Sequence, residues 1–136
     1  MSKLVVDTNV ILSSFISAGP PRLIVNRIRD RLDLLCVSPP ILDEYLVVLQ
    51  RAGLSADLLA SLFSLFQDPD RILLAFPSRR LHVIRDDPSD NMFIECAVET
   101  SADYLISGDQ HLKGLKSFQG IQIVSPREYL SRLREE

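Results

Sequence analysis

The sequence predicts an α/β fold in which a central, mainly parallel sheet of five strands carries helices on both faces. Short runs rich in Val, Ile and Leu alternate with helical segments, and no repeat or linker divides the chain. The short runs are apolar along their whole length, which is typical of strands buried on both faces. Strands that are separated by helices pair in parallel through right-handed crossovers. These observations predict three layers: helices, sheet and helices.

Length and composition are consistent with this fold. The 136 residues suffice for one domain with a core and are too few for two, so we expect residues 1–136 to form a single domain. Hydrophobic residues make up 46%, which excludes a disordered chain. No apolar run reaches the roughly 20 residues of a membrane span, and the amino terminus lacks a signal-peptide pattern. We therefore expect a cytoplasmic protein without membrane contact.

Five short apolar runs are predicted as strands. The first is followed by Asp7 and the second by Ser38, and both residues can begin a helix. The third precedes an Asp-Pro pair, and the fifth precedes Ser125. The predicted strands span residues 3–6, 34–37, 81–84, 104–107 and 121–124.

Start and stop signals place the helices of the amino-terminal half. Helices are predicted over residues 10–17 and 22–31, separated by a Gly-Pro-Pro turn. Ser38 should cap the next helix with Pro39 as its first residue, where the missing N–H of proline costs nothing. Ser55 should cap the helix that follows. Its apolar residues cover more than one face, which predicts either burial within the monomer or contact with another subunit; they are Leu58, Leu59, Leu62, Phe63, Leu65 and Phe66.

Three more helices follow in the carboxyl-terminal half. One starts at Asp87 as N-cap, with Pro88 at the first position and Asp90 at the third, and it runs to about residue 100. A short one covers residues 110–115. The last starts with a capping box made by Ser125 and Glu128.

Four acidic residues stand at the ends or near the buried edges of predicted elements: Asp7, Glu44, Asp90 and Asp109. Asp7 and Asp109 follow apolar strands, and the carboxyl ends of parallel strands are where ligands bind in open α/β sheets. If the fold gathers the four carboxylates, their like charges repel unless hard cations such as Mg²⁺ or Mn²⁺ neutralise them. The pattern thus indicates a metal site that handles phosphates.

Each acidic residue also has a purely structural interpretation. Asp7 and Asp109 could cap the helices that follow them, and Asp90 could be a first-turn residue favoured by the helix dipole. Glu44 could face solvent, although it neighbours an apolar stripe through Ile41 and Tyr45. The joint pattern is more specific, because phosphodiester cleavage commonly uses two ions about 3.5–4 Å apart.

Other polar residues are given weaker assignments. Asn9 and Ser107 could orient a ligand or a carboxylate by hydrogen bonding. Arginines form two clusters along the chain, and either solvation or phosphate contact accounts for them. The first cluster is Arg22, Arg27, Arg29 and Arg31, and the second is Arg79, Arg80 and Arg85. His82 and His111 are interpreted as structural, and Asp103 as a turn residue at the opposite edge of the sheet. Cys36 and Cys96 lie in apolar runs outside any CxxC motif, so we expect them to be buried.

The motifs VVDTNV, DDPSDNMFIECA and ADYLISGDQHL, with an acidic residue in the helix after the second strand, resemble the PIN-domain family. The resemblance covers residues 5–124 and is closest to the branch of toxin components of toxin–antitoxin systems, the VapC-like ribonucleases. It implies a three-layer α/β/α sandwich and an Mg²⁺- or Mn²⁺-dependent ribonuclease. It further implies Asp7, Glu44, Asp90 and Asp109 as catalytic, metal-binding carboxylates, with Asn9 and Ser107 as supporting polar residues.

The resulting hypothesis is an endoribonuclease that hydrolyses single-stranded or looped RNA. Its expected partners are the RNA substrate, a cognate antitoxin protein and a second copy of the chain in a homodimer or larger homo-oligomer. Two alternatives stay open. One is a catalytically silent PIN module that binds RNA or protein, and the other is a metal-dependent enzyme acting on DNA or small phosphates.

Overall fold

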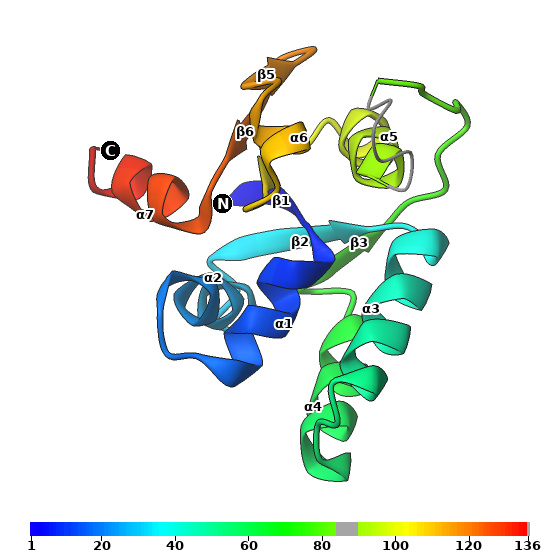
Figure 1. The fold of residues 1–136 in the computed structure, drawn as a ribbon, viewed down its shortest axis with the longest axis vertical. Coiled ribbons are helices and arrows are strands. Elements are labelled where there is room, and N and C mark those ends of the chain that lie inside the picture. Colours follow the sequence, from blue (N-terminus) through cyan, green and yellow to red (C-terminus); the bar gives the residue numbers. More distant parts are fainter. Residues whose placement is uncertain (84–89, 136) are drawn as a thin grey trace.

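The computed structural model describes residues 1–83 and 90–135 of the chain, and Figure 1 shows their arrangement. It has one six-stranded sheet with the strand order β3-β2-β1-β4-β6-β5. All neighbouring strands are parallel except β5 and β6. The strands are β1 (Ser2–Val6), β2 (Asp33–Val37), β3 (Ile72–Leu74), β4 (Tyr104–Ile106), β5 (Ser117–Phe118) and β6 (Ile121–Val124).

Helices cover both faces of this sheet, as predicted. Helices α1 and α2 lie on one side and α5 lies on the other, where it contacts β1, β2 and β4 (Figure 1). Helix α7 packs against α2 and β6, and α3 contacts both α1 and α5. The helices are α1 (Thr8–Ile16), α2 (Pro20–Arg29), α3 (Pro39–Arg51), α4 (Ala56–Phe66), α5 (Asn91–Thr100), α6 (Gln110–Lys113) and α7 (Pro126–Glu135).

The strand order reverses at β1. From β1 the chain adds β2 and β3 on one side, and it then returns to place β4 on the other side of β1. Crevices form at such a switch point, outside the carboxyl ends of the strands. The register pairs Leu4 with Tyr104 and Val6 with Ile106, so β1 and β4 end at the same level.

The predicted third strand over residues 81–84 is wrong in its described part. Residues 81–83 form no strand, and residue 84 lies outside the described residues. The backbone N–H groups of this segment donate to side chains of α5: Leu81 to Glu95 at 2.7 Å and Val83 to Asn91 at 3.0 Å. Because these donors bond to a helix, they cannot contribute to a sheet.

Two strands were missed and one predicted strand did not form in its described part, so the sheet has six strands and not five. β3 forms an edge of the sheet beside β2, and β5 is a two-residue strand that pairs antiparallel with β6. Gly120, at a φ of 85°, lies in the turn between β5 and β6 and takes a backbone conformation that favours glycine.

The helix-start predictions hold in part. The Ser55 hydroxyl accepts a hydrogen bond from Leu58 N at 3.2 Å, and Ser125 and Glu128 form the predicted capping box with bonds of 3.2 and 3.1 Å. Ser38 occupies the N-cap of α3, but its side chain makes no cap hydrogen bond. Asp90 lies at the N-cap of α5 and not at the third helical position. Asp87, its predicted N-cap, and Arg85 lie outside the described residues.

The core is a continuous apolar cluster on both faces of the sheet. Leu4, Val5 and Val6 of β1 are completely buried, as the uninterrupted apolar run predicted. Cys36 and Cys96 are buried and free, and burial raises the pKa of Cys96 to about 12. Within residues 1–83 and 90–135, no helix is long and apolar enough to cross a membrane.

Candidate functional site

The carboxyl ends of β1 and β4 bring Asp7 and Ser107 together. Asp7 follows β1 and its N–H donates to the Ile106 carbonyl at 3.0 Å, so the backbone at this point continues the pairing of the two strands. Ser107 follows β4, is completely buried, and donates its hydroxyl hydrogen to Asp7 Oδ2. The strand register therefore fixes this pair.

A cavity of about 160 Å³ opens at this edge of the sheet. All four predicted acidic residues contribute to its wall, together with the predicted Asn9. They come from four separate elements: the end of β1, the middle of α3, the start of α5 and the loop after β4. The lining residues are Asp7, Thr8, Asn9, Glu44, Val48, Asp90, Phe93 and Asp109.

Asp7 is both a helix cap and a wall of the cavity. Its Oδ1 accepts a hydrogen bond from Val10 N at 2.9 Å at the start of α1, as the capping interpretation predicted. The side chain is nevertheless buried, and this desolvation raises the pKa of Asp7, with a further contribution from the negative charge of Asp109. The hydrogen bonds from Ser107 and Val10 act in the opposite direction.

Asp109 is linked to Asp7 through Ser107. The Asp109 N–H donates to Ser107 Oγ at 2.9 Å, and the same hydroxyl donates to Asp7. Asp109 Oδ1 caps the short helix α6 by accepting from His111 N at 2.7 Å. One buried serine thus contacts the carboxylate of Asp7 and the backbone of Asp109, and its supporting role in the reaction stays a prediction.

Glu44 is held in place by Thr8, a residue that the sequence analysis did not assign to the site. The Thr8 hydroxyl donates to Glu44 Oε2, and Thr8 itself is buried at the first position of α1. Beside this contact, the buried Tyr45 donates its hydroxyl hydrogen to the Val6 carbonyl, one residue before Asp7. These two contacts join α3 to the β1–α1 junction and set the position of Glu44 relative to Asp7.

Thr8 and Tyr45 left weak signals in the sequence. Thr8 directly follows Asp7, which is its one signal, whereas Tyr45 only marks the apolar stripe of α3. Burial raises the pKa of Tyr45 well above its ordinary value, and the negative charges of Asp7 and Glu44 add to this shift. Tyr45 is therefore a neutral hydrogen-bond donor at this position.

Asp90 reaches the cavity from the start of α5 and is largely buried. The segment that precedes it runs along α5, where the N–H groups of Ser78, Leu81 and Val83 donate to Glu99, Glu95 and Asn91. The acceptors are spaced four residues apart and so lie on one face of the helix. Residues 78–83 are therefore held along one face of α5.

The donor set fits a hard divalent cation in its chemistry, since carboxylate oxygens are the ligands that Mg²⁺ and Mn²⁺ prefer. In the part of the chain that the structure describes, no three acidic, histidine or cysteine side chains are close enough together to hold an ion by themselves. Mg²⁺ does not require such a cage, because it is commonly bound through one or two carboxylates and keeps several waters.

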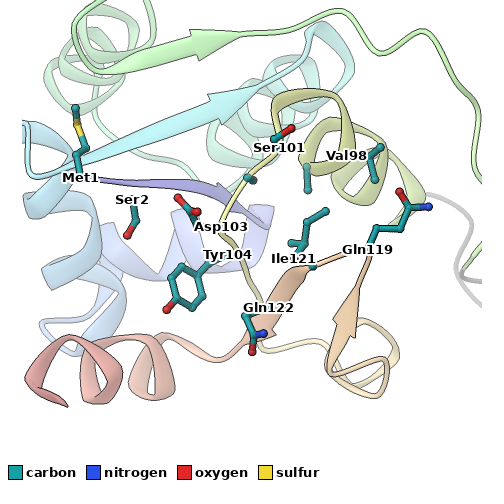
Figure 2. A pocket seen from close by; sticks show the side chains of 12 residues that line it. Met1, Ser2, Val98, Ser101, Asp103, Tyr104, Gln119, Ile121 and Gln122 are labelled. Carbon is teal, nitrogen blue, oxygen red and sulfur yellow. The ribbon is translucent and has the colours of Figure 1, made fainter. Parts of the chain in front are cut away.

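A larger cavity, of about 710 Å³, lies at the opposite, amino-terminal edge of the sheet (Figure 2). Asp103 lies in its wall, and its Oδ2 accepts a hydrogen bond from Lys3 N at 2.8 Å. This bond joins the starts of β1 and β4, which agrees with the prediction of Asp103 as a turn residue. A single acidic side chain that is already bonded to the backbone gives this cavity no comparable chemistry.

The remaining predictions concern residues outside the site. His82 and His111 are exposed, and His82 does not lie in the predicted strand. Three arginines of the first cluster bond within the protein: Arg27 to Asp33 at 2.8 Å, Arg29 to Ser61 at 3.2 Å and Arg31 to Asp70 at 3.4 Å. Arg22 donates to the Ser14 carbonyl at 3.3 Å. This cluster has structural partners, which favours the interpretation without phosphate contact.

The family model of the PIN domain matches residues 3–111, which is well over half of the chain and includes all four acidic residues of the cavity. A search among curated proteins gave no match.

Proposed function

This chain belongs to the PIN-domain family, and from that premise we propose that it is an Mg²⁺- or Mn²⁺-dependent endoribonuclease. PIN domains are generally metal-dependent nucleases, so hydrolysis of a phosphodiester bond is the activity that the family indicates. One observation carries the proposal: acidic residues from four separate elements line one small cavity at the switch point of the sheet. A purely structural role for all four would not require them to meet.

We assign Asp7, Asp90 and Asp109 to metal binding, with Glu44 completing the metal site or positioning the attacking water. A bound divalent ion would polarise the phosphoryl oxygen and lower the pKa of the water. Ser107 holds the Asp7 carboxylate, and Thr8 holds that of Glu44. Asn9 is exposed at the rim of the cavity, where its amide can orient the substrate.

The biological role that we propose is that of the toxin in a toxin–antitoxin system, acting on RNA in the cytoplasm as a homodimer that a cognate antitoxin covers. The sequence resemblance to the VapC-like branch supports this role. Exposed apolar side chains on α4, Leu58 and Phe63, support self-association. One sheet that joins residues 2 to 124 supports a single PIN nuclease domain over residues 1–136.

The test is cleavage of mixed-sequence RNA by purified protein with Mn²⁺ or with EDTA, followed by mapping of the cut ends. Asp7→Asn serves as the control, because asparagine keeps the acceptor for Val10 N but removes the charge. We expect activity with Mn²⁺ only and a loss of at least about a hundredfold in the folded variant. Undiminished cleavage by that variant would contradict the assignment of the site.

The same experiment separates the alternatives. Mn²⁺ binding without cleavage of any nucleic acid would favour a silent binding module. Faster cleavage of single-stranded DNA than of RNA at matched salt would favour a DNA nuclease. Salt has to be matched, because phosphate contacts make nucleic-acid binding depend strongly on salt.

A further inference from the structure

A second cavity, of about 310 Å³, adjoins the acidic cavity. The two share Asn9 and Asp109, so these residues lie between them. The rest of the second wall comes from the side of α1, the starts of α2 and α7, and the loop after β4. These lining residues are Val10, Ser13, Pro21, Gly108 and Pro126.

Apart from Asp109 at its border with the acidic cavity, the lining of the second cavity suits an uncharged, flat group with a polar edge. Pro21 and Pro126 present rigid apolar rings at the first turns of their helices, and Val10 adds to this surface. Ser13 and Asn9 supply a hydroxyl and an amide at the same cavity. No lysine or arginine lines it, so no basic side chain of the wall would pair with a phosphate.

The size of the cavity is that of a site for one small ligand, the class to which a nucleoside belongs. Small-molecule pockets start at about 300 Å³, which places this cavity at the lower end of the range. Gly108 leaves the space open, because a Cβ atom at this position would meet no other atom within 4 Å. The neighbouring acidic cavity, of about 160 Å³, cannot hold both an ion and a nucleoside. It borders the place where a phosphate would react.

We propose that the second cavity binds the base and ribose next to the scissile phosphate of a single-stranded RNA. This inference rests on the proposed ribonuclease function and names the part of the substrate that the site recognises. Since a base inside a duplex cannot reach such a cavity, the bound nucleotide must be unstacked. The cavity therefore selects single strands and loops over duplex RNA.

Nucleoside binding tests the cavity without metal or catalysis. Isotope-labelled protein in EDTA is titrated with each of the four ribonucleosides, and the backbone amide signals of Asn9, Ser13 and Gly108 are followed by NMR. We expect saturable shifts at these positions with at least one nucleoside, and no shifts around Asp103 at the opposite edge of the sheet. Absence of shifts at all three positions with every nucleoside would overturn the proposal.

Cleavage kinetics then connect the cavity to the substrate. Ser13→Phe places a ring in the cavity, and Ser131→Phe, an exposed serine on α7 outside both cavities, is the matched control. We expect Ser13→Phe to raise KM for single-stranded RNA at least about tenfold with kcat little changed, as loss of one base contact predicts. The control should cleave like the parent, and Mn²⁺ should raise the Tm of both variants equally.

Failure of the two proposals can be told apart. A parent protein that binds nucleosides at these amides but cleaves no RNA would overturn the ribonuclease and keep the nucleoside site. A parent that cleaves RNA, with a folded Ser13→Phe variant of unchanged KM, would overturn the nucleoside site and keep the ribonuclease. If Ser13→Phe does not fold, the titration of the parent still decides.

Discussion

The contact between Thr8 and Glu44 fixes the orientation of a carboxylate that the sequence placed only near a buried edge. Glu44 lies on the side of α3, and the Thr8 hydroxyl donates to one of its two oxygens. Mutation of a residue that holds a metal ligand in place typically lowers metal affinity or activity by roughly 10–100-fold. Thr8 should therefore act as a positioning residue for the proposed reaction.

Replacement of the hydroxyl tests this role. Thr8→Val keeps the shape of the side chain but removes the donor, and we expect at least about a tenfold loss in both Mn²⁺ affinity and RNA cleavage. Thr8→Ser keeps the hydroxyl and should restore most of both. Calorimetric Mn²⁺ titration and initial cleavage rates are the measurements. Equal loss in both variants would show that Thr8 contributes by packing instead.

The buried charge of Asp7 predicts a pH dependence of stability in the absence of metal. Its pKa in the folded protein is raised above the ordinary value of 3.8, so the folded state binds this proton more tightly than the unfolded state. The free energy of unfolding should consequently fall as pH rises from about 4 through the raised pKa. Below about pH 4 both states hold the proton and the penalty is absent.

Asp7→Asn isolates this contribution, because the other carboxylates titrate in both proteins. We expect the stability of the variant relative to the parent to increase as pH rises above about 4, when urea unfolding is followed in EDTA. A difference between the two proteins that does not vary with pH would show that Asp7 ionises as easily in the folded as in the unfolded state.

The site residues divide by how directly the sequence indicates their position. Asp7 and Ser107 could be placed because each ends an uninterrupted apolar run, which fixes its position at the edge of a parallel sheet. Thr8 and Tyr45 could not, since their roles depend on the approach of α3 to the β1–α1 junction, a contact between residues 36 and 39 positions apart. Spacing along the chain carries no signal for such a contact.

At the scale of elements, the burial of α4 shows which of its apolar residues pack within the monomer and which stay exposed. Leu62 is 1% exposed, and the ring of Phe66 packs 5.6 Å from that of Tyr45, so one side of α4 is anchored to the core. Leu58 and Phe63 are each 40% exposed. One side of the helix is therefore buried within the monomer, and contact with another subunit stays a prediction for the exposed side.

This division predicts opposite outcomes for neighbouring residues. Phe63→Ser should weaken self-association without loss of stability, whereas Leu62→Ser should cost at least about 2–5 kcal/mol because it empties a core position and buries a hydroxyl. Light scattering over a concentration series and thermal unfolding measure the two effects. A parent protein that is monomeric at high micromolar concentration would contradict the proposed homodimer.

The strand predictions failed where hydrogen-bond partners, not apolar character, decide the structure. Residues 81–83 resemble a strand, yet Leu81 and Val83 bond to side chains of α5. Ile72–Leu74 looks similar in sequence and does pair with β2, in register Leu35 with Ile72. An apolar run joins a sheet only if its backbone lies beside another strand. That position depends on the tertiary fold and cannot be predicted from the run itself.

At the scale of the whole molecule, the strand order explains why residues 83 positions apart share a cavity. Asp7 and Asp90 approach because the chain reverses its direction of strand addition after β3, so that α5 crosses the opposite face of β1 from α1. Alternation of strands and helices predicted the parallel sheet and its two covered faces, but not which strands lie side by side. We expect the gathering of four carboxylates at one cavity to have an energetic consequence, since like charges that share a site destabilise a metal-free protein.

This effect of like charges on stability distinguishes two roles for Asp90, that of a metal ligand and that of a helix cap. In the cavity, Asp90→Asn removes a repelling charge and asparagine remains a good N-cap, so the metal-free variant should be as stable as the parent or more stable. It should also lose most of the stabilisation that Mn²⁺ confers by binding the folded state alone. If Asp90 only favours the helix dipole, the variant should instead lose roughly 0.3–1 kcal/mol and respond to Mn²⁺ like the parent.

Asp57→Asn is the matched control, because Asp57 is an exposed acidic residue in the first turn of α4, outside the cavity. Thermal melts in EDTA and in excess Mn²⁺ are recorded for the parent and both variants. We expect Asp57→Asn to melt slightly lower in EDTA and to gain as much from Mn²⁺ as the parent, because it loses only a helix-dipole interaction. Asp90→Asn should show the reverse on both counts. If the two variants behave alike, Asp90 is a structural residue, and the metal would have to be held without it.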